Sequence, residues 1–422
     1  MHAPARLRRP ILLATVFVTG AGILALEIVG ARLISPQFGV SLYVWSALIT
    51  VTLVALAAGY AAGGWLADRR ASPGDLGLLI ALAALGVAAV PPLASPVFDA
   101  TARLGLRLGA LGSAFLLVAA PLAALAMVTP YAVKLLAAGT GHIGVSTGVV
   151  YAVSTAGSVA GALAAGFALV PRLSLDAICY LLALVLIVAA ALSWLAAGAS
   201  PRRMVPTILL GLLTLLISAI GFRSPEPAFF SGELFHGQSL YGELRVIDVA
   251  GARLLLLNGI IQSGLDAGGA SIYPYSHAME RLLPPDARRL LLVGLGGGAL
   301  VRSLQRGPMV VDVVELDPLV ADLARRYFGY APGAGTLFIE DGRRFLNTTD
   351  RRYDAILLDA YAAEAPPHHL LSVEAFTMVR ARLAPEGVLL LNYREVAGDR
   401  RGSQAIPALM RTLHAVFPAV TL

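Results

Sequence analysis

Long hydrophobic segments alternate with short polar turns over the first half of the chain. Seven of them cover residues 11–34, 42–66, 76–97, 111–137, 145–170, 174–197 and 205–222. Each approaches or exceeds the roughly 20 residues that a helix needs to span the hydrocarbon core of a bilayer. Gly157, Gly161 and Gly166 are expected to give the fifth segment a smooth face for close helix packing. The pattern predicts an α-helical polytopic membrane domain over residues 1–222, with the lipid bilayer as a partner.

The pattern changes after residue 222. Residues 223–235 are rich in proline and polar residues, and they predict a linker. Residues 241–248 and 253–257 then alternate like the two strands of a β-hairpin around Ala250 and Gly251, and a helix is expected over 270–283. Strands predicted over 289–294, 310–316, 336–340, 353–359 and 387–392 alternate with helices over 298–306, 318–328, 342–347 and 372–383. Residues 236–422 are therefore predicted to form an α/β Rossmann-like domain, in which helices cover both faces of a parallel sheet, with a small N-terminal β-hairpin region.

Composition supports this division and excludes several classes of site. Of the 422 residues, 57% are hydrophobic and only 14% are charged, against about 25% charged in soluble domains. The net charge of +6 comes from scattered arginines without interleaved aromatic residues, so no nucleic-acid partner is expected. The single cysteine, Cys179, excludes an intramolecular disulfide framework. His277, His368 and His369 lack the spacing of metal ligands, and no metal is predicted.

The basic residues at the segment ends give conflicting evidence on orientation. One side of the predicted bundle carries Arg6, Arg8, Arg9, Arg69, Arg70, Lys134, Arg202 and Arg203, and the other carries Arg103, Arg107 and Arg172. The positive-inside rule places the first side in the cytoplasm, and seven full spans would then place the C-terminal domain outside. The cofactor class that the motifs of the C-terminal domain indicate is made in the cytosol, however. We expect a multi-pass protein of the bacterial inner (plasma) membrane with a cytoplasmic C-terminal domain, and with one segment re-entrant or the charge count misleading.

A glycine turn follows the first strand of the α/β domain. Gly294, Gly296 and Gly298 lie in the sequence VGLGGG, where a nucleotide that approaches the backbone needs residues without side chains. The next helix can offer free N–H groups from its first turn. One strand later, Glu315 can accept hydrogen bonds from both ribose hydroxyls. Together they predict an adenosyl-nucleotide site.

Two further acidic residues follow the next two strands. The glycine turn with its acidic residue does not separate a nicotinamide fold from an adenosylmethionine fold. Asp341 and Gly342 follow the third strand, where a methyltransferase-like fold places a side chain beside the adenine amino group, and they favour the second. The Rossmann-like domain is therefore predicted to be of the methyltransferase type. Asp359 ends the fourth strand. Because ligands bind at the carboxyl ends of strands in open α/β sheets, these acidic residues are expected to converge on one crevice.

The motifs together resemble those of the spermidine synthase family of aminopropyltransferases, and more closely its membrane-fused bacterial branch. They are SLY (239–241), NGIIQ (258–262), VGLGGG, VVELDP, EDGRRF, YDAILLDAY and PHHLLS (367–372), with ALEIVGARLISPQFG and AAGYAAGGWLADR in the membrane part. The resemblance implies transfer of an aminopropyl group from decarboxylated S-adenosylmethionine to a polyamine such as putrescine, with release of methylthioadenosine. Asp359 matches the general base, Tyr241 and Gln262 match positions near the cosubstrate and the amine, and Tyr275 matches a further active-site tyrosine. Relatives often form oligomers, so a homodimer is possible.

Departures from the family pattern keep other functions open. Gly297 replaces an acidic residue that helps to bind the amino end of the cosubstrate. Asn258 stands where the family has the aspartate of an Asp-Gly motif. Ala362 replaces the second acid of a paired-Asp motif, with Glu364 nearby. A methyltransferase or another reaction of intact S-adenosylmethionine is therefore an alternative. A second alternative is a polyamine transporter or sensor with a regulatory nucleotide domain.

Two ionisable residues in the first hydrophobic segment bear on the second alternative. Glu27 and Arg32 lie near the end of that segment. Charged groups at membrane depth are costly and often functional. Both a polar path for a solute and a structural interfacial pair are consistent with them.

Overall fold

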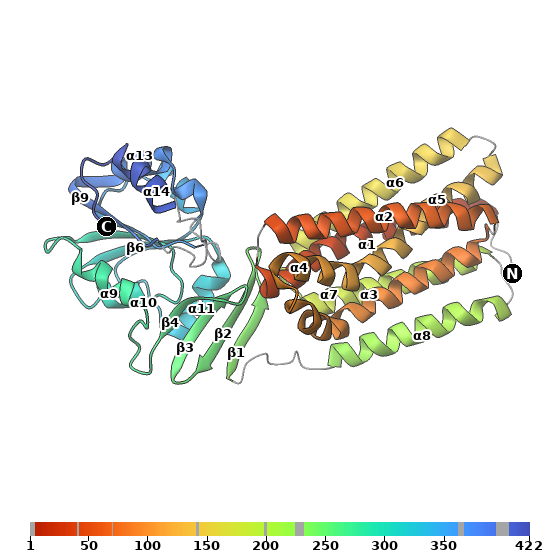
Figure 1. The fold of residues 1–422 in the computed structure, drawn as a ribbon, viewed down its shortest axis with the longest axis horizontal. Helices are drawn as coiled ribbons and strands as arrows, with labels where there is room; N and C mark the ends of the chain where they lie inside the picture. Colours follow the sequence, from red (N-terminus) through yellow and green to blue (C-terminus); the bar gives the residue numbers. More distant parts are fainter. Residues whose placement is uncertain are drawn as a thin grey trace. The chain divides into compact units, whose positions relative to one another are not determined.

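The structure is a computed structural model that describes residues 5–39, 42–69, 71–140, 143–197, 201–223, 232–361, 367–393 and 405–422 (Figure 1). The chain divides into two compact units, Met1–Pro227 and Ala228–Leu422. Arg70, Ala362, Glu364 and residues 224–231 of the predicted linker lie outside the described residues.

In its described part, the first unit consists of helices joined by short turns. Its helices are α1 (Ala5–Phe38), α2 (Leu42–Arg69), α3 (Pro73–Ala102), α4 (Gly105–Ala114), α5 (Ala120–Thr140), α6 (Ile143–Leu163), α7 (Leu175–Ala197) and α8 (Pro201–Arg223). π-Helical stretches join α4 to α5 at Phe115–Ala119 and extend α6 at Ala164–Leu169. By length and composition, seven helices are able to cross a membrane: Arg9–Phe38, Tyr43–Arg69, Pro73–Ala102, Gly105–Ala137, Ile143–Leu169, Leu175–Trp194 and Met204–Arg223. The seven predicted segments are confirmed as such helices.

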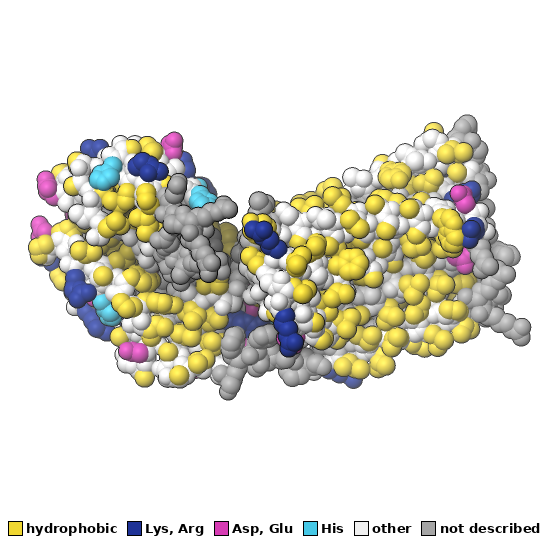
Figure 2. All heavy atoms as spheres, in the orientation of Figure 1, with side chains coloured by type: hydrophobic (Ala, Val, Ile, Leu, Met, Phe, Trp, Pro, Cys, Tyr) yellow, Lys and Arg dark blue, Asp and Glu magenta, His cyan; other side chains and the backbone are white. Residues whose placement is uncertain are grey.

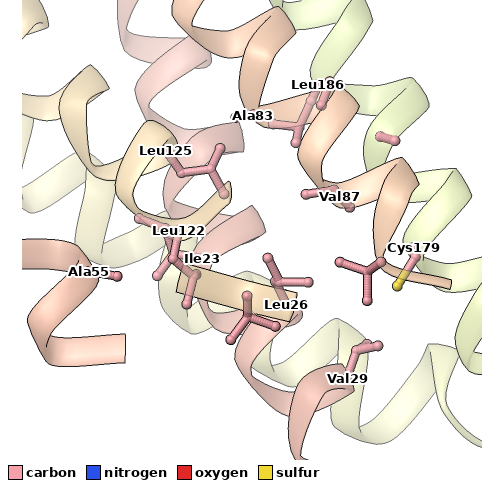
Figure 3. Packing of buried hydrophobic residues seen from close by; sticks show 14 of the residues in the cluster. Ile23, Leu26, Val29, Ala55, Ala83, Val87, Leu122, Leu125, Cys179 and Leu186 are labelled. Carbon is pink, nitrogen blue, oxygen red and sulfur yellow. The ribbon is translucent and has the colours of Figure 1, made fainter. Parts of the chain in front are cut away.

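The helical unit buries an aliphatic core and shows an apolar side surface. Leu26 of α1, Val87 of α3, Leu122 of α5 and Cys179 of α7 lie in the same buried cluster (Figure 3). On the face shown in Figure 2, charged side chains of this unit gather at its two ends, and hydrophobic or uncharged surface lies between them. This distribution fits a bundle with an apolar belt, because charged groups avoid the hydrocarbon region of a bilayer.

Glycines allow α1 and α6 to pack closely. A Cβ atom on Gly157 would meet the backbone of Phe17, and one on Gly161 would lie 2.6 Å from Cα of Ala21. Two of the three predicted glycines therefore form the packing face. The prediction was wrong for Gly166, where a Cβ atom would have no neighbour within 4 Å. Gly166 lies beyond the contact, in the π-helical stretch that changes the helix periodicity.

The second unit begins with an antiparallel sheet of four strands in sequential order. They are β1 (Glu233–Gln238), β2 (Glu243–Val249), β3 (Ala252–Leu257) and β4 (Ile260–Leu265). The predicted hairpin is β2–β3, but β1 lies partly in the predicted linker and β4 was not predicted. Asn258 and Gly259 both have positive φ, 50° and 78°, which is typical of the two-residue turn of a β-hairpin. The sheet packs on helix α11 through Leu244, Val246, Leu255 and Leu323, among others.

A parallel sheet of five strands forms the centre of the second unit. Its order is β7 (Leu337–Ile339), β6 (Val310–Glu315), β5 (Arg289–Val293), β8 (Tyr353–Leu358) and β9 (Leu383–Leu391). The connecting helices are α9 (Pro274–Arg281), α10 (Ala299–Leu304), α11 (Pro318–Phe328), α12 (Gly342–Thr348), α13 (Val373–Arg382) and α14 (Ala405–His414). This order, with parallel crossovers, is that of a Rossmann-like methyltransferase fold, as predicted.

Helices cover both faces of the parallel sheet because its strands are apolar on both faces. Leu290 and Leu292 of β5 pack with α9, α10 and α11. Leu291 and Val293 of the same strand pack with α12, α13 and α14. Successive residues of a strand point to opposite faces, so one continuous hydrophobic run supplies both cores. The carboxyl ends of the strands remain at one edge of the sheet.

Candidate functional site

The glycine turn connects β5 to α10. Gly294, Gly296 and Gly298 have φ values of +99°, +53° and +77°, in the left-handed region that favours glycine. A Cβ atom on Gly294 would meet the backbone of Asp359 and would lie 3.1 Å from Cα of Ala360. The turn therefore passes directly against the end of β8, and Gly298 precedes the first residue of α10.

Glu315 ties this turn to the end of β6. One carboxylate oxygen, Oε2, accepts a hydrogen bond from the backbone N–H of Leu295 at 2.9 Å, and Oε1 accepts one from the N–H of Asp317 at 2.9 Å. Burial raises the pKa of Glu315, and the backbone donors oppose this effect. An ionised carboxylate offers about four acceptor positions, so Glu315 retains capacity for a ligand's hydroxyl groups.

Asp341 begins helix α12 at the end of β7. Its Oδ1 caps the helix by accepting from the backbone N–H of Arg344 at 2.9 Å, and its Oδ2 lies 3.1 Å from Nε2 of His369. Gly342 is the first helical residue, and a Cβ atom there would lie 2.5 Å from a methyl carbon of Val293. The lack of a side chain thus lets the helix start close to β5, next to the glycine turn.

Asp359 follows β8 and is bound from two sides. The hydroxyl of Tyr275 donates to Oδ2 at 3.0 Å, and the side-chain amide of Asn392 donates to Oδ1 at 2.8 Å. Burial raises the pKa of Asp359 to about 6, although both hydrogen bonds lower it. Burial and then the charge of Asp359 raise the pKa of Tyr275, so its hydroxyl keeps its proton. Asp359 is thus a carboxylate that is ionised at neutral pH and able to accept a proton.

The sequence analysis missed Asn392. It directly follows β9, the strand next to β8, and its backbone N–H donates to the carbonyl oxygen of Leu358 at 3.0 Å. A polar residue after the apolar run VLLL (388–391) is the same signal that identified Asp359. Applied to the fifth strand, the strand-end rule would have found it.

Tyr241 and Gln262 lie in the antiparallel sheet or its turns, whereas Glu315, Asp341 and Asp359 lie at the ends of strands of the parallel sheet. Tyr241 lies in the turn between β1 and β2 and is exposed. Partial burial raises its pKa, and the negative charges of Asp317, Asp341 and Glu315 raise it further. Gln262 lies on β4, where its amide nitrogen is 3.5 Å from the carbonyl oxygen of Ile260.

Two exposed apolar side chains flank the acidic residues. Leu316 follows Glu315 and is 40% exposed, and Ile339 ends β7 and is 47% exposed. Both lie at the carboxyl ends of neighbouring strands. Exposed aliphatic side chains at such an edge can hold the flat faces of a purine. The sequence analysis did not single them out, because hydrophobic residues at strand ends usually continue the core.

The space beside Gly297 is filled by other side chains. A Cβ atom on Gly297 would lie 2.9 Å from a ring carbon of Phe328 and 2.9 Å from Oγ of Ser263. An acidic side chain at this position would therefore displace both. The turn carries no carboxylate of its own, and the hydroxyl of Ser263 lies next to it instead.

No metal centre is formed by the residues that the structure describes. Among them, no group of three or more His, Cys, Asp or Glu side chains is arranged to hold an ion. His369 contacts Asp341, and both His368 and His277 are exposed.

Comparison with known proteins shows what part of the second unit is similar to. Residues 277–421 match the family model of the spermine/spermidine synthase domain. A probable polyamine aminopropyl transferase of Bifidobacterium longum is 32% identical over 197 residues, which are 45% of this chain and 44% of that protein. Putrescine N-methyltransferase 2 of Nicotiana tabacum is 29% identical over 168 residues, covering 37% and 46%. The chain thus spans less than half the length of these curated relatives.

The chain was also compared with solved structures. A probable spermidine synthase from Corynebacterium glutamicum matches with 21% sequence identity and a TM-score of 0.38, over 46% of this chain and 72% of that one.

Proposed function

We propose, on the premise that residues 277–421 form a spermine/spermidine synthase domain, that this chain is a membrane-bound aminopropyltransferase. The donor would be decarboxylated S-adenosylmethionine and the acceptor a polyamine such as putrescine. Relatives named as polyamine aminopropyltransferases support the reaction class. The residues at the strand ends support each part of it.

The adenosyl end of the donor would bind along the edge from β5 to β7. Gly294, Gly296 and Gly298 let the donor approach the backbone, and Glu315 would accept the ribose hydroxyls. Asp341 and Gly342 would face the adenine edge, with Leu316 and Ile339 on the base. Tyr241 and Gln262 would contact the aminopropyl chain or the amine, and no metal is required.

The chemical step would occur beside Asp359. A protonated amine is not a nucleophile, so Asp359 takes a proton from the attacking ammonium group. The amine nitrogen then bonds to the methylene carbon next to the sulfonium. The carbon–sulfur bond breaks, and its electron pair returns to sulfur to give neutral methylthioadenosine. Tyr275 and Asn392 orient the carboxylate through their hydrogen bonds of 3.0 and 2.8 Å.

The doubly hydrogen-bonded Asp359, with its raised pKa, is the observation that carries this proposal. Purified full-length protein with decarboxylated S-adenosylmethionine and putrescine should release methylthioadenosine and spermidine. The Asp359→Asn variant should release neither above background. Absence of product with several diamines and polyamines, in protein that still binds the donor, would refute the proposal.

Gly297 supports a second candidate, a reaction of intact S-adenosylmethionine such as methyl transfer. Without an acid in the turn, no carboxylate there favours the decarboxylated form. The backbone and the Ser263 hydroxyl beside it would tolerate the extra carboxylate of the intact donor. The similarity to a protein named putrescine N-methyltransferase agrees with this alternative. Mass spectrometry decides between them, because methyl transfer yields S-adenosylhomocysteine and aminopropyl transfer yields methylthioadenosine.

The helical unit would hold the enzyme in the bacterial inner membrane with the C-terminal unit in the cytoplasm, where the donor is made. All seven helices are long enough to span, so this orientation places the N-terminus outside, against the arginine distribution. Reporter fusions at the two termini test the proposal. A cytoplasmic reporter should be active at the C-terminus only, and the reverse result would place the catalytic unit outside.

A further inference from the structure

Glu27 is an ionisable residue within an apolar membrane-spanning helix. It lies in the span Arg9–Phe38, about 27 Å along the axis from Arg9 and about 16 Å from Phe38 at 1.5 Å per residue. Its side chain is half-buried, and among the residues that the structure describes no hydrogen bond or ion pair to its carboxylate is found. A charged group at this depth costs several kcal/mol unless a counter-charge meets it.

Thr52 of α2 supplies a second polar group with no partner. It is 3% exposed, and its Oγ1 has no hydrogen-bond partner among the described residues. Threonines in helices commonly donate to the carbonyl four residues earlier. Other threonines of this unit do so, namely Thr15, Thr19, Thr101 and Thr214. The hydroxyl of Thr52 thus lacks the bond within its own helix that these four threonines make.

A helix contact brings Glu27 and Thr52 to the same level. A Cβ atom on Gly30 of α1 would lie 3.5 Å from a methyl carbon of Leu48 on α2. α1 and α2 run in opposite directions because a short connection joins them. Glu27 lies one turn before Gly30, and Thr52 lies one turn after Leu48. Both residues therefore lie one turn from this contact in the same direction. Residues three or four apart share a helix face, so Glu27 lies on the face of α1 that carries Gly30, and Thr52 lies on the face of α2 that carries Leu48.

A distortion of the neighbouring helix borders the same place. A Cβ atom on Gly30 would also lie 3.4 Å from a methyl carbon of Val118, which belongs to the π-helical stretch Phe115–Ala119. Single π-helical turns inside α-helices are frequent at functional sites. The surroundings thus offer a carboxylate, a hydroxyl and irregular backbone, and no ion pair to the carboxylate is found among the described residues.

We propose that Glu27 and Thr52 form a binding site for an alkylammonium ion inside the helical unit. An ammonium group supplies the missing positive charge to Glu27 and donates a hydrogen bond to the oxygen of Thr52. A charge-assisted hydrogen bond of this kind suits a primary amine better than a fully hydrated metal ion. The site lies in the membrane-spanning unit and is separate from the crevice that contains Asp359.

Equilibrium binding of radiolabelled putrescine to the full chain in lipid nanodiscs tests the proposal. All proteins carry Asp359→Asn to weaken amine binding at the catalytic unit, and no adenosyl donor is present. The assay therefore does not depend on aminopropyl transfer. Glu27→Gln removes the charge at nearly constant shape, and Thr52→Val removes the hydroxyl. Thr214→Val, at a threonine bonded within its own helix, and Asp99→Asn, at an exposed acid, are the matched controls.

The expected result is loss of one bound putrescine per chain in Glu27→Gln, or at least tenfold weaker binding. Thr52→Val should weaken binding about threefold to tenfold, and both controls should bind as the parent does. Unchanged stoichiometry and affinity in Glu27→Gln would overturn the proposal, as would a parent protein that binds no putrescine outside the catalytic unit. If Glu27→Gln does not fold, the comparison of Thr52→Val with Thr214→Val decides by itself.

Discussion

Removal of the Tyr275 hydroxyl tests whether Asp359 is a base whose ionisation is set by its hydrogen bonds. This hydroxyl donates to the carboxylate at 3.0 Å and lowers its pKa, which burial has raised to about 6. A hydrogen bond to a charged group contributes about 1.5–3 kcal/mol. At 1.36 kcal/mol per pH unit, the Tyr275→Phe substitution should therefore raise the pKa of Asp359 by about 1–2 units, to about 7–8.

The consequence is a defect that depends on pH. In the parent protein, kcat/KM should fall tenfold per unit below about pH 6, because only the ionised carboxylate accepts the proton and kcat/KM reports the free enzyme. At pH 6, the parent is about half ionised and the variant is about 1–10% ionised, so activity should fall about 5-fold to 50-fold. At pH 9, both are almost fully ionised, and most of this defect should disappear.

The assay is release of methylthioadenosine between pH 5 and pH 9. Tyr273→Phe is the matched control, because the Tyr273 ring lies 5.7 Å from the Tyr275 ring while its hydroxyl is 3.5 Å from the carbonyl oxygen of Ile261. The control should keep the acid limb near pH 6. An equal loss of activity by Tyr275→Phe at pH 6 and pH 9, or an unshifted limb, would refute the reasoning.

Three further predictions concern stability and donor binding. The folded-state pKa of Asp359, about 6, lies above its ordinary value of 3.8, so ionisation of Asp359 destabilises the fold as the pH rises through this window. Asp359→Asn should therefore unfold at a higher temperature than the parent at pH 7.5, with a free energy of unfolding larger by up to about 3 kcal/mol. Near pH 4 the two proteins should not differ. Gly161→Leu should lower the unfolding temperature in detergent, because overpacking costs about 1–3 kcal/mol, whereas Gly166→Leu should not; equal effects would contradict the packing of α1 on α6. His369→Ala removes the contact to Asp341 and should raise KM for the donor about fivefold without changing kcat, since a hydrogen bond contributes about 1 kcal/mol; a change in kcat alone would argue against a role in donor binding.

Hydrogen bonds between distant strands explain why part of the site was not predicted. Asp359 was predicted because it ends an apolar strand, and the carboxyl ends of parallel strands lie at one edge. Its partners are 84 and 33 residues away in sequence. The contact with Asn392 exists because β9 pairs with β8, and a sequence pattern does not specify which strands are neighbours. The hairpin turn at Asn258 and Gly259 could have been predicted locally, because Asn-Gly is typical of two-residue turns. The sequence analysis used these two residues only as part of a family motif.

The sequence by itself determined the features that depend on local chemistry. Long apolar runs form helices within a bilayer, because backbone N–H and C=O groups have no water there and need hydrogen-bond partners within the helix. Strand–helix alternation and acidic residues at strand ends likewise follow from periodicity. Only the tertiary structure decided what surrounds each of these groups. It showed Gly157 and Gly161 against α1 with Gly166 in open space, Phe328 and Ser263 beside Gly297, and Tyr275 with Asn392 on Asp359. These outcomes depend on packing between segments far apart in the chain, where a shift of one helix turn or one strand position changes every neighbour.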